Sequence, residues 1–144
     1  MINKLSVKNF RSIEDAEVTL APITVLYGPT SSGKSTLLYS LLVLRNFSLN
    51  PNQPADGYFN LNFMNLGGFD ACVFNHEASK GVTVSIAHGE NDRAISYNVS
   101  MSKSSGEAKL QSNLVNMQTK FSIPFPLNQA FPFPLHDQGE DFTV

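Results

Sequence analysis

The sequence predicts an α/β fold, and three observations lead to that prediction. A short apolar run at residues 23–27 precedes a loop at 28–36 that contains two glycines, and a segment free of Gly and Pro follows at 35–45. Several other segments alternate apolar and polar residues, which is typical of half-buried strands. A strand, loop and helix combined with such strands indicates one α/β domain with an antiparallel β layer.

Composition sets the broad class of protein. The chain has 144 residues, 42% of them hydrophobic and 15% charged, which is typical of a single globular domain. No secretion signal follows Met1 and no apolar run is long enough to span a membrane, so we expect a cytoplasmic protein. A net charge of −2 gives no basic footprint, so nucleic acid is a possible partner of a full protein but is not supported by this chain.

Two strands are expected before the glycine loop. Residues 4–10 alternate apolar and polar, residues 17–20 do so again, and a charged turn at 12–15 separates them. The β-branched run at 23–27 predicts a third strand, buried on both faces. The segment at 35–45 predicts a helix, and its many leucines indicate a helix buried on most sides, as when it lies against a sheet.

The rest of the chain predicts more β structure. Residues 46–68 hold Asn, Gly and Pro throughout, so we expect the region 46–80 to be rich in loops. Residues 81–87 and 94–101 alternate cleanly around a polar turn at 89–92, which predicts an antiparallel hairpin. The segment 109–121 fits either a helix or a strand, and we favour a strand, so that 81–121 forms the antiparallel layer.

The tail at 122–144 is rich in Pro and Phe. Its near-repeats, residues 123–127 and 131–135, place prolines at alternate positions. Proline there excludes a regular helix and a central strand, because it lacks the N–H that both require. We expect an extended tail that is either packed along an edge or loose.

The loop at 28–36 has the Walker A spacing Gly28-x-x-x-x-Gly33-Lys34-Ser35. Glycines let successive N–H groups surround phosphate oxygens, and the helix N-terminus adds positive potential. Lys34 is expected to reach the β- and γ-phosphates as the catalytic cation, and Ser35 to bind Mg²⁺. The predicted contacts to ATP from this loop are Gly28, Pro29, Thr30, Ser31, Ser32, Gly33, Lys34, Ser35 and Thr36.

Other parts of a complete enzyme are not visible in the sequence. No run of four apolar residues ends in Asp or Glu, as the metal-binding carboxylate of a P-loop ATPase would require. A guanine-reading Asn/Thr-Lys-x-Asp motif is missing, which disfavours GTP. Three arginines, Arg11, Arg45 and Arg93, are few for a kinase lid. Three readings remain: an ATP-binding lobe, a small phosphotransferase, or a non-catalytic interaction domain with a vestigial loop.

Residues 5–13 read LSVKNFRSI, and residues 23–29 read ITVLYGP. Together they resemble the opening of ABC-type P-loop ATPases of the structural-maintenance-of-chromosomes and RecF group, including their stand-alone AAA-like relatives. The resemblance covers roughly residues 2–45, a third of the chain. It implies that Arg11 and Ser12 approach the bound nucleotide. In the usual loop of that group, Asn and Gly stand where this chain has Thr30 and Ser31.

The resemblance also implies how the chain is organised. Residues 1–144 would be a single N-terminal nucleotide-binding lobe of a larger ATPase, with the strands, Walker A loop and helix in 1–45. The signature helix and carboxylate strand would come from a later segment. We therefore expect the whole protein to be an ATPase, and this chain alone not to hydrolyse ATP efficiently. A downstream lobe or second head is the expected partner, in a nucleotide-dependent dimer.

Overall fold

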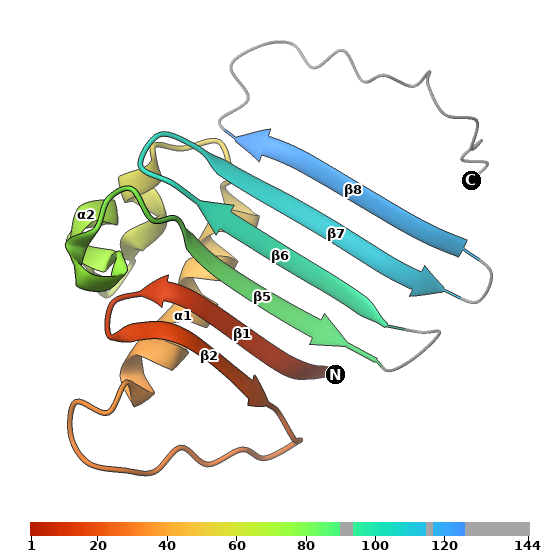
Figure 1. Cartoon of the computed structure of the whole chain (residues 1–144), viewed down its shortest axis with the longest axis horizontal. Coiled ribbons are helices and arrows are strands. Elements are labelled where there is room, and N and C mark those ends of the chain that lie inside the picture. Colours follow the sequence, from red (N-terminus) through yellow and green to blue (C-terminus); the bar gives the residue numbers. More distant parts are fainter. Residues whose placement is uncertain (90–93, 115–116, 126–144) are drawn as a thin grey trace.

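The computed structural model describes residues 1–89, 94–114 and 117–125. Its main element is a sheet of six strands in the order β2-β1-β5-β6-β7-β8, and every pair of neighbours is antiparallel (Figure 1). The strands are β1 (Ile2–Phe10), β2 (Ile13–Thr19), β5 (Val82–His88), β6 (Ile95–Met101), β7 (Gly106–Leu114) and β8 (Met117–Phe125). The chain is thus α/β with the expected antiparallel layer, and the two N-terminal strands belong to the same sheet.

The β1–β2 hairpin is tighter than the sequence predicted. Its turn is Arg11 and Ser12 alone, and β2 begins at Ile13, so the expected turn at 12–15 and the expected start at Glu17 are both wrong. The acidic residues that suggested a longer turn, Glu14 and Asp15, are exposed residues of the edge strand β2. Lys8 and Asp15 form an ion pair at 3.0 Å, across from each other in the ladder.

The β5–β6 hairpin is confirmed, although residues 90–93 of its predicted turn lie outside the described part. The segment 109–121 is strand, not helix, but it contributes to two strands, β7 and β8, where one was expected. β8 lies at the edge of the sheet, where Pro124 pairs with Glu107. An edge strand tolerates a proline because one side of its ladder is unpaired. The predicted extended tail beyond residue 125 lies outside the described residues.

The predicted buried strand at 23–27 is wrong. These residues pair with no strand in the described part of the chain, and Ile23, Val25 and Tyr27 are 85%, 75% and 91% exposed. A β-branched sequence favours extended backbone, but a strand also needs a neighbour to satisfy its N–H and C=O groups. The segment that would form the phosphate-loop strand of the expected fold is therefore not a strand in this structure.

The predicted helix is confirmed and runs further, as α1 (Lys34–Leu49). It lies across one face of the sheet (Figure 1), so burial on most sides was wrong, and Leu38 is 54% exposed. The sheet and the η1–β3 region cover part of the helix, and the remaining face is open to water. The buried residues of α1 are Thr36, Leu37, Ser40, Val43, Leu44 and Phe47.

The region after α1 is more ordered than a loop. It contains five short elements: η1 (Ala55–Phe59), β3 (Asn60–Leu61), β4 (Met64–Asn65), α2 (Gly68–Cys72) and η2 (Phe74–His76). Phe59 is fully buried between Phe10 and Phe69, at ring distances of 6.3 and 6.0 Å. Aromatic rings scattered among polar residues therefore carry part of the core, which explains why the periodicity gave no signal.

Two contacts hold the region at 55–76 against α1 and β1. Asn46 of α1 donates from Nδ2 to the carbonyls of Gly57 and Tyr58, each at 3.0 Å. The backbone N–H of Arg11 donates to the carbonyl of Cys72 at 2.7 Å. The β1–β2 turn, the start of α1 and the end of α2 are thereby brought to one side of the molecule.

Candidate functional site

The glycine loop ends in a helix N-terminus that glycine makes possible. Gly33 precedes α1 with φ 86°, and its carbonyl accepts the N–H of Leu37 at 2.9 Å. Gly28 also has a positive φ, of 144°. Residues with a Cβ resist such angles, so the two spaced glycines set the shape of the loop. The first N–H groups of α1 have no partner within the helix and stay free for an acceptor.

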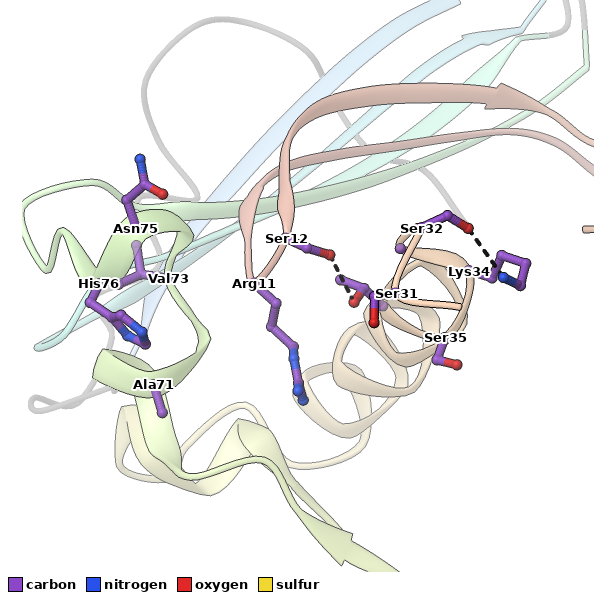
Figure 2. A pocket seen from close by; sticks show the side chains of 12 residues that line it. Arg11, Ser12, Ser31, Ser32, Lys34, Ser35, Ala71, Val73, Asn75 and His76 are labelled. Atoms are coloured by element: carbon purple, nitrogen blue, oxygen red, sulfur yellow. Dashed lines mark hydrogen bonds between the residues drawn. The ribbon is translucent and has the colours of Figure 1, made fainter. Parts of the chain in front are cut away.

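A cleft of about 480 Å³ opens beside this helix N-terminus. Figure 2 shows its two walls: the glycine loop and the start of α1 on one side, and a turn after α2 on the other, with Arg11 between them. The lining residues are Arg11, Ser12, Ser31, Ser32, Gly33, Lys34, Ser35, Thr36, Ala71, Val73, Asn75 and His76. The volume lies within the range of small-molecule sites, about 300–1,000 Å³.

Most residues predicted from the sequence meet in this cleft. Arg11 and Ser12 come from the β1–β2 turn, and the loop supplies every residue from Ser31 to Thr36. Gly28 and Pro29 instead line a second, more apolar hollow of about 430 Å³, which borders β2 and the exposed run at 25–27. Thr30 is exposed and lines neither space.

The β1–β2 turn is tied to the start of α1 by side chains. The hydroxyls of Ser12 and Thr36 are hydrogen-bonded at 3.3 Å, and Thr36 is buried. The Arg11 guanidinium lies 5.9 Å from the centre of the Tyr39 ring, within the range of a cation–π contact. These contacts place a positive charge at the mouth of the cleft without an acidic partner among the lining residues.

The Lys34 ammonium folds back on its own loop. Its Nζ donates to the carbonyls of Gly28 and Pro29, at 2.9 and 2.6 Å, and to Ser32 Oγ at 3.1 Å. All three donors of the ammonium are thus satisfied by the loop. A phosphate oxygen is a stronger acceptor than a carbonyl or a hydroxyl, so an entering phosphate would compete for the same protons.

No sequence pattern predicted the opposite wall of the cleft. Ala71, Val73, Asn75 and His76 stand about forty residues beyond the loop and match no motif. His76 Nδ1 lies 3.1 Å from the carbonyl oxygen of Asp70, across the turn. Only the fold brings this turn to the cleft, through the hydrogen bond between Arg11 and Cys72.

Backbone strain is concentrated around the cleft. Five described residues other than glycine have positive φ, and four of them line it: Arg11, Ser31, Asn75 and His76. Each such conformation costs on the order of 1–3 kcal/mol and persists only where the surroundings impose it. Clustered strain is typical of ligand sites, so it adds support that is independent of the motif.

The residues present suit a nucleotide with Mg²⁺. Free N–H groups at the helix N-terminus, Lys34 and Arg11 suit phosphates, and the exposed Ser35 hydroxyl can take one place on a phosphate-bound metal. Among the described residues, no group of three His, Cys, Asp or Glu could hold a metal by itself. Burial raises the pKa of the Cys72 thiol to about 11, so Cys72 stays protonated and is a poor metal ligand.

No helix in the described part of the chain has both the length and the apolar character needed to cross a membrane.

Comparison with known proteins agrees with this geometry. The chain is 44% identical over 41 residues to the OLD nuclease of Thermus scotoductus, a match that covers 28% of this chain and 8% of that protein. The chain therefore spans less than a tenth of that relative. A family model described as an AAA ATPase domain matches residues 1–131. Because the match takes in the glycine loop, the cleft and the whole described sheet, the chain belongs to the AAA ATPase domain family.

Proposed function

We propose that the cleft binds Mg²⁺-ATP. The observation that supports this most strongly is the loop at 28–36, which has positive φ at both motif glycines and leads into α1 beside a cleft of nucleotide size. The phosphates would lie against the free N–H groups of α1, where the helix dipole favours negative charge. Family membership supports a nucleotide as the ligand.

Distinct roles then follow for Lys34, Ser35, Arg11 and Ser12. Lys34 exchanges its bonds to Gly28, Pro29 and Ser32 for bonds to the β- and γ-phosphates. Ser35 contributes its hydroxyl to Mg²⁺, and Arg11 contributes charge from the opposite side of the phosphates. Ser12 acts through its hydrogen bond to Thr36, which holds the β1–β2 turn at the mouth of the cleft.

ATP hydrolysis would need a carboxylate that this cleft does not supply. None of the residues that line it is Asp or Glu. A metal-assisted attack of water requires a group that orients the water and an acid that holds the metal. We therefore propose that the chain is the nucleotide-binding lobe of an ABC-type, SMC/RecF-like ATPase, and that a downstream lobe or a second head supplies the acid in a nucleotide-dependent dimer.

The exposed run at 23–27 supports that proposal. Ile23, Val25 and Tyr27 form a β-branched and aromatic stretch without a neighbouring strand among the described residues. Such a stretch is stable as a strand only when another strand pairs with it.

Calorimetric titration of the chain with Mg²⁺-ATP tests the proposal, with Mg²⁺-GTP and the Lys34→Ala variant beside it. We expect saturable binding of ATP, weaker binding of GTP, and at least a tenfold loss in the variant, about 1.4 kcal/mol. Multiple-turnover hydrolysis should be absent from the chain alone. No ATP binding, or equal binding by Lys34→Ala, would refute the proposed site, whereas Lys34-dependent turnover would refute only the need for a further lobe.

A further inference from the structure

The wall of the cleft opposite the phosphate loop carries no residue of the phosphate-binding motif. It is formed by Ala71 at the end of α2 and by the turn that carries Val73, Asn75 and His76 (Figure 2). A nucleotide with its phosphates on the loop still has its ribose and base to place. The cleft continues from the loop past Arg11 to this wall, so the wall is a described surface that the base and ribose can meet.

Backbone hydrogen bonds and a buried side chain hold the turn, although two of its residues are strained. Asn75 and His76 have φ of 54° and 56°. Backbone hydrogen bonds join the N–H of His76 to the carbonyl of Val73 at 3.1 Å and the N–H of Glu77 to that of Phe74 at 3.2 Å. The side chain of Val73 is buried in the core, which anchors the turn from below. The surroundings thus hold consecutive residues in a conformation that costs free energy, as ligand sites often do.

The hydrogen bond of His76 determines which of its ring nitrogens can meet a ligand. A carbonyl oxygen can only accept, so Nδ1 carries the proton and donates it to the Asp70 carbonyl. In the neutral ring Nε2 is then a lone-pair acceptor. Figure 2 shows the imidazole on the cleft side of the turn, above Ala71 and facing the Arg11 side chain. The wall therefore presents one oriented acceptor beside a small apolar residue.

We propose that this wall reads the base, and that His76 Nε2 accepts a hydrogen bond from the exocyclic amine of adenine. The inference rests on the proposed ATP site and assigns its specificity to a residue that no motif marks. Adenine carries an amine at the position where guanine carries a carbonyl oxygen, so guanine would set two acceptors against each other. An acceptor that meets no donor in the bound state weakens binding, which is the basis of the discrimination. Ala71 leaves room for the plane of the ring.

Binding of three ligands separates base recognition from phosphate binding. Mg²⁺-ATP, Mg²⁺-GTP and Mg²⁺-tripolyphosphate, which has no nucleoside, are titrated into the chain at pH 8, where histidine side chains are usually neutral. The variants are His76→Gly, which removes the side chain and tolerates the positive φ, and His76→Asn, whose backbone also accepts that region. His88→Ala is the matched control, because His88 is the last residue of β5 and does not line the cleft.

The proposal predicts a change in preference. The unmodified chain should bind ATP about tenfold or more tightly than GTP, and both His76 variants should reduce that ratio to about twofold, the loss of one hydrogen bond. Tripolyphosphate affinity and the melting temperature measured alongside should change little. His88→Ala should behave like the unmodified chain. If His76→Gly does not fold, His76→Asn decides the question.

Three results would overturn the inference. An unchanged ATP-to-GTP ratio in a folded His76 variant, with Lys34→Ala still abolishing binding, would refute base reading and leave the ATP site intact. An equal loss of ATP and tripolyphosphate would show that His76 acts on the phosphates. Failure of the unmodified chain to bind any of the three ligands would refute the ATP site and this inference together.

Discussion

Ser31 shows how much the phosphate loop depends on single backbone angles. Its φ is 65°, in the left-handed region, at the position where the resembled ATPases usually have glycine. The loop has therefore kept a glycine-like conformation although the residue has a Cβ. Its neighbour Ser32 does not have a positive φ, and its hydroxyl oxygen accepts a hydrogen bond from Lys34. Ser31 therefore has a strained backbone, whereas Ser32 does not.

We predict that Ser31→Gly and Ser32→Gly change the free energy of unfolding by different amounts or in opposite directions. At position 31 relief of backbone strain offsets the greater entropy of the unfolded chain, so the free energy of unfolding should stay level or rise, by up to about 1 kcal/mol. At position 32 no strain is relieved, and a loss of about 0.5–1 kcal/mol is expected. Urea unfolding of both variants measures the difference. Equal losses would mean that Ser31 is not strained.

The exposed run at 23–27 and strand β5 show what turns a β-prone sequence into a strand. Val25 is 75% exposed, whereas Val84 of β5 is fully buried, with β1 on one side and β6 on the other. Both are β-branched residues in segments that favour extended backbone, so propensity does not distinguish them. The two valines differ in their neighbours. The strands on both sides of Val84 pair with its backbone N–H and C=O groups and help to cover its side chain.

We predict that a Val→Thr substitution lowers the free energy of unfolding much more at position 84 than at position 25. Val84→Thr places a hydroxyl in the core and should lower the free energy of unfolding by about 1–3 kcal/mol. Val25→Thr should change it by less than about 0.5 kcal/mol in this chain, because solvent already reaches the side chain. Chemical denaturation measures both. A large loss for Val25→Thr would contradict the exposure of this run.

At the scale of the whole molecule, the burial of Cys72 in the core links the stability of the fold to pH. It is the one cysteine of the chain, its side chain is fully buried, and its Sγ lies 3.5 Å from the carbonyl oxygen of Leu66. Burial raises the pKa of the thiol from 9.0 to about 11, because water no longer stabilises the thiolate. Folding therefore favours the protonated form of this group.

We predict a pH dependence of stability from this shift. Below pH 9 the thiol is protonated in both states, so its contribution is fully present. Between pH 9 and 11 the unfolded state loses the proton first, and the free energy of unfolding should fall by about 2 kcal/mol. The fall should be missing from Cys72→Ala, whose stability is compared at each pH to remove other titrating groups. Parallel curves would refute the assignment.

Local patterns were sufficient for much of the fold. Alternation predicted β1 and the β5–β6 hairpin, since each strand has a periodicity that its own residues express. The spacing of Gly28, Gly33 and Lys34 predicted the loop and the start of α1 for the same reason: positive φ and a helix N-terminus are properties of a few consecutive residues. The phosphate side of the candidate site could therefore be predicted without a structure.

The sequence by itself determined that this chain has an antiparallel layer, a phosphate loop and a helix after it. Only the tertiary structure decided that residues 23–27 pair with none of the described strands, that Phe59 joins the core, and that His76 lines the cleft. These outcomes depend on contacts between segments far apart in the chain. The hydrogen bond from Arg11 to Cys72 spans about sixty residues, and no local pattern encodes such a contact.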